Sequence, residues 1–341
     1  MEQWLEHVIA DLPWVVLLVI IVVTFITLSK GADVLVEEAV TLSMRWGVPK
    51  VLIGATIVSL GTTMPEAAVS VLAAIQGSPD LALGNAVGSI ICDTGLILGV
   101  ATLITPLPLD RTIVNRQGWL QLGAGVLLVV ASLPFGALGG MFDAGGRLPQ
   151  WAGVAFLLLL GLYLWKSITW TRGAQLDQLP NGVAAGDTAG TLVAGLKLVG
   201  GIVLVIGSSW VLIPAVREAA LRLHIPPSII AATLVAFGTS LPELVTAVTA
   251  ALKRHGELAV GNIIGADILN VLFVSGAAAA VTPGGLHVSA HFFTMLFPAM
   301  LFVLVVFRIG IFMSGTALKR PFGLVLIGIY IAVTVLSYTQ P

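Results

Sequence analysis

Long runs of apolar residues alternate with short polar connections along most of the chain. A helix that spans a bilayer needs about 20 predominantly apolar residues, and hydropathy together with turn residues predicts ten such helices. They cover residues 12–38, 50–77, 81–104, 117–137, 150–168, 190–216, 227–252, 257–282, 290–308 and 322–338. The first and sixth are long enough to tilt or to project from the membrane. The pattern therefore predicts an all-α membrane protein with ten transmembrane helices.

Two polar motifs occur once in each half of the chain. GATIVSLGTTMPE at residues 54–66 corresponds to AATLVAFGTSLPE at 231–243, and GNAVGSIICD at 84–93 corresponds to GNIIGADILN at 261–270. Both pairs share one offset of 177 residues. Chance similarity of apolar segments is the alternative, and two motifs at one spacing argue against it. Five helices per half is an odd number, so the second half must lie inverted, as in many secondary transporters.

The most polar connection, residues 169–189, separates the two halves. We expect a first repeat at 1–168, a cytoplasmic linker at 169–189 and a second repeat at 190–341. If the N-terminus is outside, Lys and Arg of the loops and helix ends number eleven on the cytoplasmic side and three outside. Cytoplasmic loops are the richer side in Lys and Arg. The sequence thus predicts a multi-pass protein of the cytoplasmic membrane with both termini outside.

The composition of the chain argues against a soluble domain and against a nucleic-acid-binding protein. The chain is 57% hydrophobic and 10% charged, against roughly 25% charged residues in soluble domains. A net charge of −1 does not favour binding to a nucleic acid. Cys92 is the single cysteine and cannot form an intrachain disulfide. The acidic start of the chain lacks the basic residues and cleavage site of a signal peptide. We find no Cys/His metal motif and no hydrolase motif, so we expect neither an enzyme nor a cofactor.

The motifs GTTMPE at 61–66 and GTSLPE at 238–243 lie near the middle of apolar segments. Proline has no N–H for the carbonyl four residues earlier, so Pro65 frees the carbonyl of Gly61 and Pro242 frees that of Gly238. Free carbonyls at membrane depth are tolerated only where they face protein, water or a ligand. The motifs therefore predict broken helices at a polar site.

Each motif also supplies side-chain oxygens. Carbonyls, hydroxyls and carboxylates together are the ligand set of a hard cation such as Ca²⁺ or Na⁺. A proline kink with a snorkelling glutamate is the alternative, but each glutamate lies deep in its segment and the arrangement occurs twice. The candidate ligands of the two motifs are Thr62, Thr63, Glu66, Thr239, Ser240 and Glu243.

The GNxxG motifs carry glycines at a spacing that permits close helix packing, which is the favoured interpretation for the glycines alone. Packing does not explain the acids that follow these glycines. An acidic side chain within a span costs free energy on insertion into the membrane and usually faces a polar pathway. Ser89 and Asp93 are four residues apart and share a helical face, and Asp267 and Asn270 can also share one. We predict a site role for Asp93, whereas Asp267 could instead be a supporting or gating group.

The paired GT[ST]xPE motifs, each followed by GNxxG, resemble the repeats of the calcium/cation antiporter superfamily, in particular its prokaryotic sodium/calcium exchanger branch. The resemblance is strongest over 54–100 and 231–277. It implies one Ca²⁺ site surrounded by Na⁺ sites. By position the ligands become Glu66, Glu243, Thr62, Thr63, Thr239, Ser240, Ser89, Asp93 and Asn270, with the carbonyls of Ser59 and Ala236.

Some positions depart from that family. Thr63 stands where Ser is usual, Ala266 stands opposite Ser89, and Asp93 carries the acid with Asn270 opposite. These differences bear on the Na⁺ sites more than on the divalent site, and Asp267 could add one more charge.

The expected function is exchange of Ca²⁺ for Na⁺ by alternating access. An H⁺- or K⁺-coupled antiporter of the same fold is the nearest alternative, and a passive cation channel is an alternative of another class. Channels are usually oligomers with ligand rings around a shared axis, whereas one chain completes this site, so a monomer would suffice.

Overall fold

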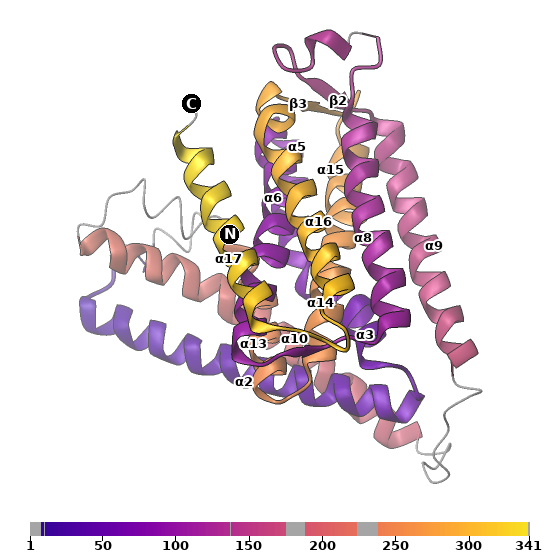
Figure 1. The fold of residues 1–341 in the computed structure, drawn as a ribbon. Helices are drawn as coiled ribbons and strands as arrows, with labels where there is room; N and C mark the ends of the chain where they lie inside the picture. The colour runs from indigo at the N-terminus through magenta and orange to yellow at the C-terminus, as the bar shows by residue number, and fades with distance from the viewer. Residues whose placement is uncertain (1–7, 10, 137, 175–187, 224–237, 340–341) are drawn as a thin grey trace.

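The computed structural model describes residues 8–9, 11–136, 138–174, 188–223 and 238–339, and it is almost entirely helical (Figure 1). The first half contains α2 (Trp14–Trp46), α3 (Lys50–Ile53), η1 (Gly54–Val58), α4 (Ser59–Thr62), α5 (Met64–Ile75), α6 (Pro79–Ile91), η2 (Cys92–Ile97), α7 (Leu98–Ile104), α8 (Arg111–Ser132), η3 (Leu138–Gly140) and α9 (Gln150–Ala174). The second half contains α10 (Thr188–Arg222), α13 (Leu241–Leu252), α14 (Gly256–Leu269), η5 (Asn270–Ser275), α15 (Gly276–Val281), η6 (Phe292–Leu296), α16 (Phe297–Met313) and α17 (Arg320–Thr339).

These helices cover most of the described part of every apolar segment that the sequence singled out. Among the described residues, six helical runs are individually long and apolar enough to cross a membrane, and the bent pair Lys50–Thr62 with Met64–Ile75 adds a seventh if it is one span. The run Gly256–Val281 is the most enclosed, with 83% of its apolar window buried, while the window of Arg320–Ser337 is only 11% buried. Helices α14, η5 and α15 therefore form the centre of the bundle, and α17 lies at its periphery.

The helix break predicted at the first proline motif is present. The two helical arms meet at Thr63 with a bend of 45°, and Pro65 lies in the first turn of α5. In the second motif α13 likewise begins at Leu241 with Pro242 in its first turn. The segment before it, 224–237, lies outside the described residues.

Four stretches of the described chain are π-helical: η1, η2, η5 and η6. A π-turn widens the hydrogen-bond ladder by one residue and often occurs at functional sites. Asp93 lies within η2, and Asn270 begins η5. The hydropathy pattern gave no indication of these stretches.

The element boundaries repeat with the 177-residue offset of the motifs. Helix α5 begins at Met64 and α13 at Leu241, while α6 begins at Pro79 and α14 at Gly256. The π-helices η2 and η5 follow at nearly the same spacing. The sequence repeat is thus also a repeat of local structure.

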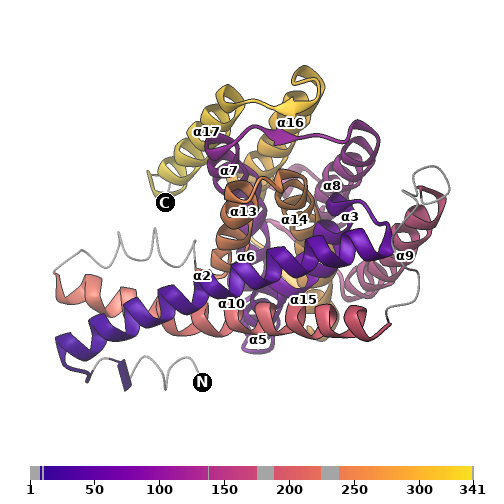
Figure 2. The same ribbon diagram turned by 90° about the horizontal axis from the view of Figure 1, so that it is seen from below.

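The long helices α2 and α10 lie side by side across one face of the bundle (Figures 1 and 2). They contain 33 and 35 residues, so each is about 50 Å long at 1.5 Å per residue. They run antiparallel, because Arg222 donates to the Leu12 carbonyl at one end while Lys197 pairs with Glu38 towards the other. A side chain at Gly31 or Gly201 would strike the partner helix, so these glycines let the two backbones come close.

Two short antiparallel ribbons join loops of opposite halves. Strand β1 (Leu107–Pro108) pairs with β4 (Ala317–Leu318), and β2 (Gly146–Leu148) pairs with β3 (Leu286–Val288). The all-α prediction did not include them. They connect the two halves outside the helical core, with β2 and β3 at the top of Figure 1.

Candidate functional site

Four carboxyl groups are buried where the broken helices meet. Glu66, in the first turn of α5, and Asp93, in η2, are both 0% exposed, while Glu243 is 1% and Asp267 2% exposed. Proline in the first turn of α5 and of α13 places each glutamate in the first turn of a helix that begins in the middle of the bundle. Glu66 is close enough to repel Glu243 and Asp93, and Asp93 to repel Asp267.

The two halves exchange hydrogen bonds at this site. The Thr63 hydroxyl donates to Oε1 of Glu243 at 3.3 Å, and the Ser240 hydroxyl donates to Oε1 of Glu66 at 3.5 Å. Thr63 and Ser240 are equivalent under the 177-residue offset, so the contacts are reciprocal. Ser240 also lies 3.2 Å from the hydroxyl of Ser89. The structure therefore brings the hydroxyls and both glutamates of the two motifs together.

Two asparagines complete the reciprocal pattern, although the sequence analysis did not select them. Thr239 donates to Oδ1 of Asn85 at 3.1 Å, and its equivalent Thr62 donates to Oδ1 of Asn262 at 3.5 Å. Asn85 also donates to the Glu66 carbonyl at 3.2 Å. The sequence does mark them, because each asparagine follows the first glycine of a GNxxG motif and the two are separated by the same offset of 177 residues.

Several buried oxygens at the site have no hydrogen-bond partner among the described residues. They are Oε2 of Glu66 and of Glu243, both carboxylate oxygens of Asp93, Oδ1 of Asp267 and Oδ1 of Asn270. Buried polar groups are normally paired, since an unpaired one loses its hydration without compensation. These atoms accept hydrogen bonds or bind cations. A cluster of unpaired acceptors therefore indicates a place for a cation.

Asp267 is held differently from the other acids. Its Oδ2 accepts from the hydroxyl of Thr94 in η2 and from the amide of Gln121 on α8, each at 2.5 Å. Gln121 is 3% exposed and also contacts the Thr94 hydroxyl at 3.2 Å. The position equivalent to Asp267 in the first half is Ile90. The fourth carboxylate thus breaks the symmetry of the site and has donors of its own.

Of the two carbonyl ligands implied by the family resemblance, the structure describes that of Ser59 and does not describe that of Ala236. The carbonyl of Ser59 accepts the Thr63 N–H at 2.9 Å, so a cation there would share this oxygen. Ala236 lies outside the described residues. The neighbouring carbonyl of Ala55, in η1, accepts the buried Tyr163 hydroxyl at 2.9 Å. Tyr163, on α9, stabilises the open turn that precedes the helix break.

The packing interpretation agrees with the structure for the second GNxxG motif but not for the first, where a Cβ at Gly84 would come within 3.9 Å of Phe292 alone and one at Gly88 would meet nothing within 4 Å. A Cβ at Gly261 would lie 2.1 Å from the Val51 carbonyl oxygen, and one at Gly265 would lie 2.5 Å from the Cα of Ala55. Helix α14 therefore crosses α3 and η1 backbone to backbone. This contact fixes Asp267 and Asn270 relative to the first broken helix.

Among the described residues, no group of three or more His, Cys, Asp or Glu side chains is placed to hold a metal ion. Repulsion between the acids opposes such a cluster, and hydroxyls stand beside both glutamates. The ion pairs of the described chain involve none of the four acids. A cation here would bind a mixed set of carboxylate, hydroxyl and carbonyl oxygens contributed by both halves.

Buried acids without a cationic partner, inside a bundle of long apolar helices, are typical of membrane cation transporters. The model of the sodium/calcium exchanger protein family matches residues 16–169 and 193–339, which is most of the chain. The chain belongs to this family and is a membrane antiporter for cations.

Curated relatives and a solved structure agree with this assignment. Inner membrane protein YrbG of Escherichia coli (strain K12) is 30% identical over 318 residues, covering 87% of this chain and 93% of the relative. Sodium/calcium exchanger MaX1 of Methanosarcina acetivorans is 31% identical, covering 94% and 97%. The sodium-calcium exchanger NCX_Mj, soaked with 10 mM Na⁺ and zero Ca²⁺, shares the fold with a TM-score of 0.76 at 24% identity, over 94% of this chain and 98% of that chain.

The reciprocal hydroxyl contacts make a prediction. Thr63→Ala or Ser240→Ala should weaken Ca²⁺ binding by roughly tenfold, because a hydrogen bond to a charged group contributes about 1.5–3 kcal/mol. Thr63→Ser and Ser240→Thr keep the hydroxyl and should bind nearly as the wild type. Isothermal titration of the purified protein with CaCl₂ would measure both pairs. Equal losses in the alanine and the hydroxyl-retaining variants would contradict a role for the hydroxyl.

Proposed function

We propose that this protein exchanges Ca²⁺ for Na⁺ across the cytoplasmic membrane by alternating access. The observation that supports it most is the set of unpaired, fully buried oxygens on Glu66, Glu243 and Asp93. Membership of the sodium/calcium exchanger family adds to it. Oxygen ligands with negative charge suit both cations, since Ca²⁺ takes six to eight oxygens in flexible geometry.

In this proposal, Ca²⁺ binds the two glutamates with Asp93 nearby. Na⁺ occupies overlapping oxygens from the surrounding groups, and Asp267 adjusts the charge of the site. The remaining proposed ligands are Thr62, Thr63, Ser89, Thr239, Ser240 and Asn270, with the carbonyls of Ser59 and Ala236.

The proposed topology has ten transmembrane helices in two inverted repeats, at 1–168 and 190–341. A cytoplasmic linker at 169–189 joins them, and both termini face outward. The antiparallel course of α2 and α10 supports the inversion, since these helices hold equivalent places in the two halves. The boundaries of α9 and α10 leave residues 175–187 outside the described chain.

Coupling follows from the electrostatics of the site. Carboxylates gathered without a cation repel one another, so an empty site disfavours the closed state through which access must switch. Either cation relieves the repulsion and permits the switch. The pair α2 and α10 is the moving element in this proposal, because it packs across one face of the bundle and each helix extends well beyond a bilayer's width.

Transport in proteoliposomes tests the proposal. Vesicles loaded with Na⁺, K⁺ or acidic buffer would be diluted into ⁴⁵Ca²⁺ in choline at matched osmolarity. We expect uptake only from Na⁺-loaded vesicles. Uptake driven by K⁺ or by the pH gradient would instead support the K⁺- or H⁺-coupled antiporter. Uptake that proceeds equally without any outward gradient would support the passive channel and contradict antiport.

A salt bridge between α13 and α2 gives a second prediction. Lys253, which follows α13, lies 3.0 Å from Asp33 and 2.6 Å from Glu37 on α2. Burial lowers the pKa of Lys253, but the hydrogen bonds to the two acids outweigh it and the net pKa is raised. The bridge restrains α2, the proposed moving helix, so Lys253→Met should raise the Ca²⁺ exchange rate by about two- to fivefold, as expected for a partly exposed pair.

The control is Lys319→Met, at an exposed residue before α17, and it should leave the rate unchanged. Raising the ionic strength should reproduce part of the Lys253→Met effect in the wild type, because salt screens exposed pairs. A Lys253→Met rate equal to that of the wild type at all salt concentrations would show that the bridge does not restrain α2.

A further inference from the structure

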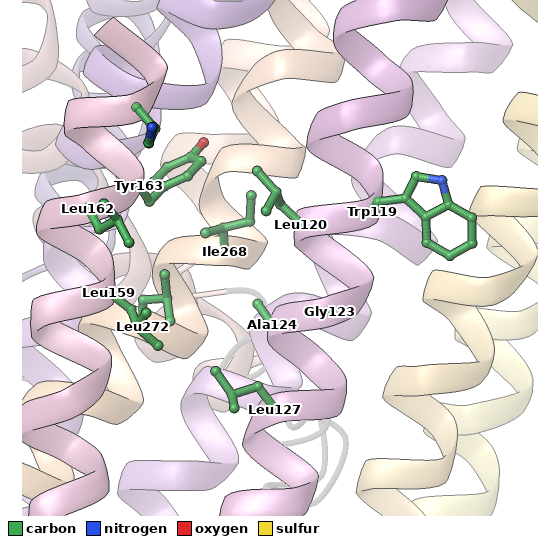
Figure 3. A pocket seen from close by; sticks show the side chains of 11 residues that line it. Trp119, Leu120, Gly123, Ala124, Leu127, Leu159, Leu162, Tyr163, Ile268 and Leu272 are labelled. Atoms are coloured by element: carbon green, nitrogen blue, oxygen red, sulfur yellow. The ribbon is translucent and has the colours of Figure 1, made fainter. Parts of the chain in front are cut away.

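A groove runs between α8 and α9 on the outside of the bundle (Figure 3). Its cavity volume is about 310 Å³. Leu120 and Leu127 of α8 form one wall and Leu159 of α9 the other, while Ile268 and Leu272 of α14 and η5 form the floor. The two outer helices both pack on the central helices and leave space between themselves.

The walls of the groove carry exposed apolar side chains. Leu159 is 39%, Leu162 48% and Trp119 55% exposed. Within a bilayer such a surface contacts hydrocarbon rather than water. An apolar groove open to hydrocarbon fits an acyl chain, and its volume lies at the lower end of the ~300–1,000 Å³ common for ligand sites.

A positively charged side chain, that of Lys166, lies at one end of this groove. Lys166 of α9 lines it, is exposed, and stacks over the Trp165 ring at 4.9 Å. None of the ion pairs within the described residues involves it. Tryptophan and lysine together are typical of the membrane–water boundary, where lipid phosphates lie. The groove thus pairs an apolar channel with a positive charge at headgroup depth.

We propose that this groove binds an anionic phospholipid, with an acyl chain against Ile268 and Leu272 and the phosphate at Lys166. The position is close to the cation site. Ile268 follows Asp267 directly, and Gln121, which holds Asp267, follows the wall residue Leu120. A bound chain packs on the outer side of the helices whose inner sides carry the site.

Native mass spectrometry of the purified protein tests the proposal without any transport measurement. It would be titrated with phosphatidylglycerol and with phosphatidylcholine of identical chains. We expect tighter binding of phosphatidylglycerol by about fivefold, the contribution of one lysine near an anionic headgroup. Lys166→Gln should remove this preference, while Lys319→Gln, an exposed lysine elsewhere, should keep it.

A second variant tests the apolar part. Gly123→Leu places a side chain inside the groove and should weaken binding of both lipids, with the melting temperature confirming that the variant is folded. Equal affinity for the two lipids in the wild type would overturn the proposal. So would a preference that survives Lys166→Gln, or binding unchanged by Gly123→Leu. Because the readout is lipid binding, these outcomes are independent of which ions the protein exchanges.

Discussion

Glu66→Gln and Glu243→Gln should each reduce Ca²⁺ exchange by on the order of 100-fold. Each substitution removes one negative charge from a buried oxygen set, and ligand charge is a main determinant of Ca²⁺ affinity. Glutamine keeps the size of the side chain and can still accept the hydroxyl hydrogen bond of Ser240 or Thr63. The loss should therefore come from binding rather than from unfolding.

The measurement is ⁴⁵Ca²⁺ uptake into Na⁺-loaded proteoliposomes, with the reconstituted protein quantified. Glu257→Gln is the matched control, since Glu257 lies in the first turn of α14, away from the reciprocal contacts. It should transport at the wild-type rate. Wild-type transport by both site variants would remove these glutamates from the proposed mechanism.

Gly265→Val should lower the apparent melting temperature by roughly 2–6 °C, from an overpacking cost of about 1–3 kcal/mol. A Cβ at this position would lie 2.5 Å from the Cα of Ala55, 2.6 Å from the Ala55 carbonyl oxygen and 2.6 Å from the Ser59 hydroxyl. Two of these three contacts are backbone atoms, which cannot rotate away. The helices α14 and η1 would have to separate, and Asn270 would move with them.

Thermal unfolding in detergent, followed by size-exclusion chromatography, measures this effect. Gly161→Val provides the comparison, because Gly161 is an exposed residue of α9 and valine there meets only lipid or detergent. It should shift the melting temperature little. If Gly265→Val and Gly161→Val were equally stable, the close crossing of α14 over η1 would be wrong.

The sequence predicted what depends on local chemistry. Proline at 65 and 242 predicted where helices begin inside the bundle, and the bend at Thr63 confirms the first break. The 177-residue offset predicted which residues are equivalent, and the reciprocal contacts of Thr63 and Ser240 follow it. The first prediction rests on proline, which alters the backbone within one helical turn. The second rests on motifs that occur twice in the chain.

Features that depend on packing could not be predicted in this way. Gln121 and Tyr163 are ordinary polar residues within apolar helices, and only the fold brings them to Asp267 and to the Ala55 carbonyl. The π-turns at Asp93 and Asn270 lie where η2 packs on α17 and η5 packs on α6. Arg308 is similar: by sequence it counts among the basic residues at helix ends, yet it is 4% exposed and lies over the rings of Trp119 and Phe312.

The reciprocal contacts also constrain how this chain can change over generations. Thr63 donates to Glu243 and Ser240 to Glu66, the pattern that a two-fold interface between identical subunits would show. Neither half holds a complete set of partners for its own glutamate. A substitution at Ser240 therefore changes the surroundings of Glu66 in the other half, and one at Thr63 changes those of Glu243.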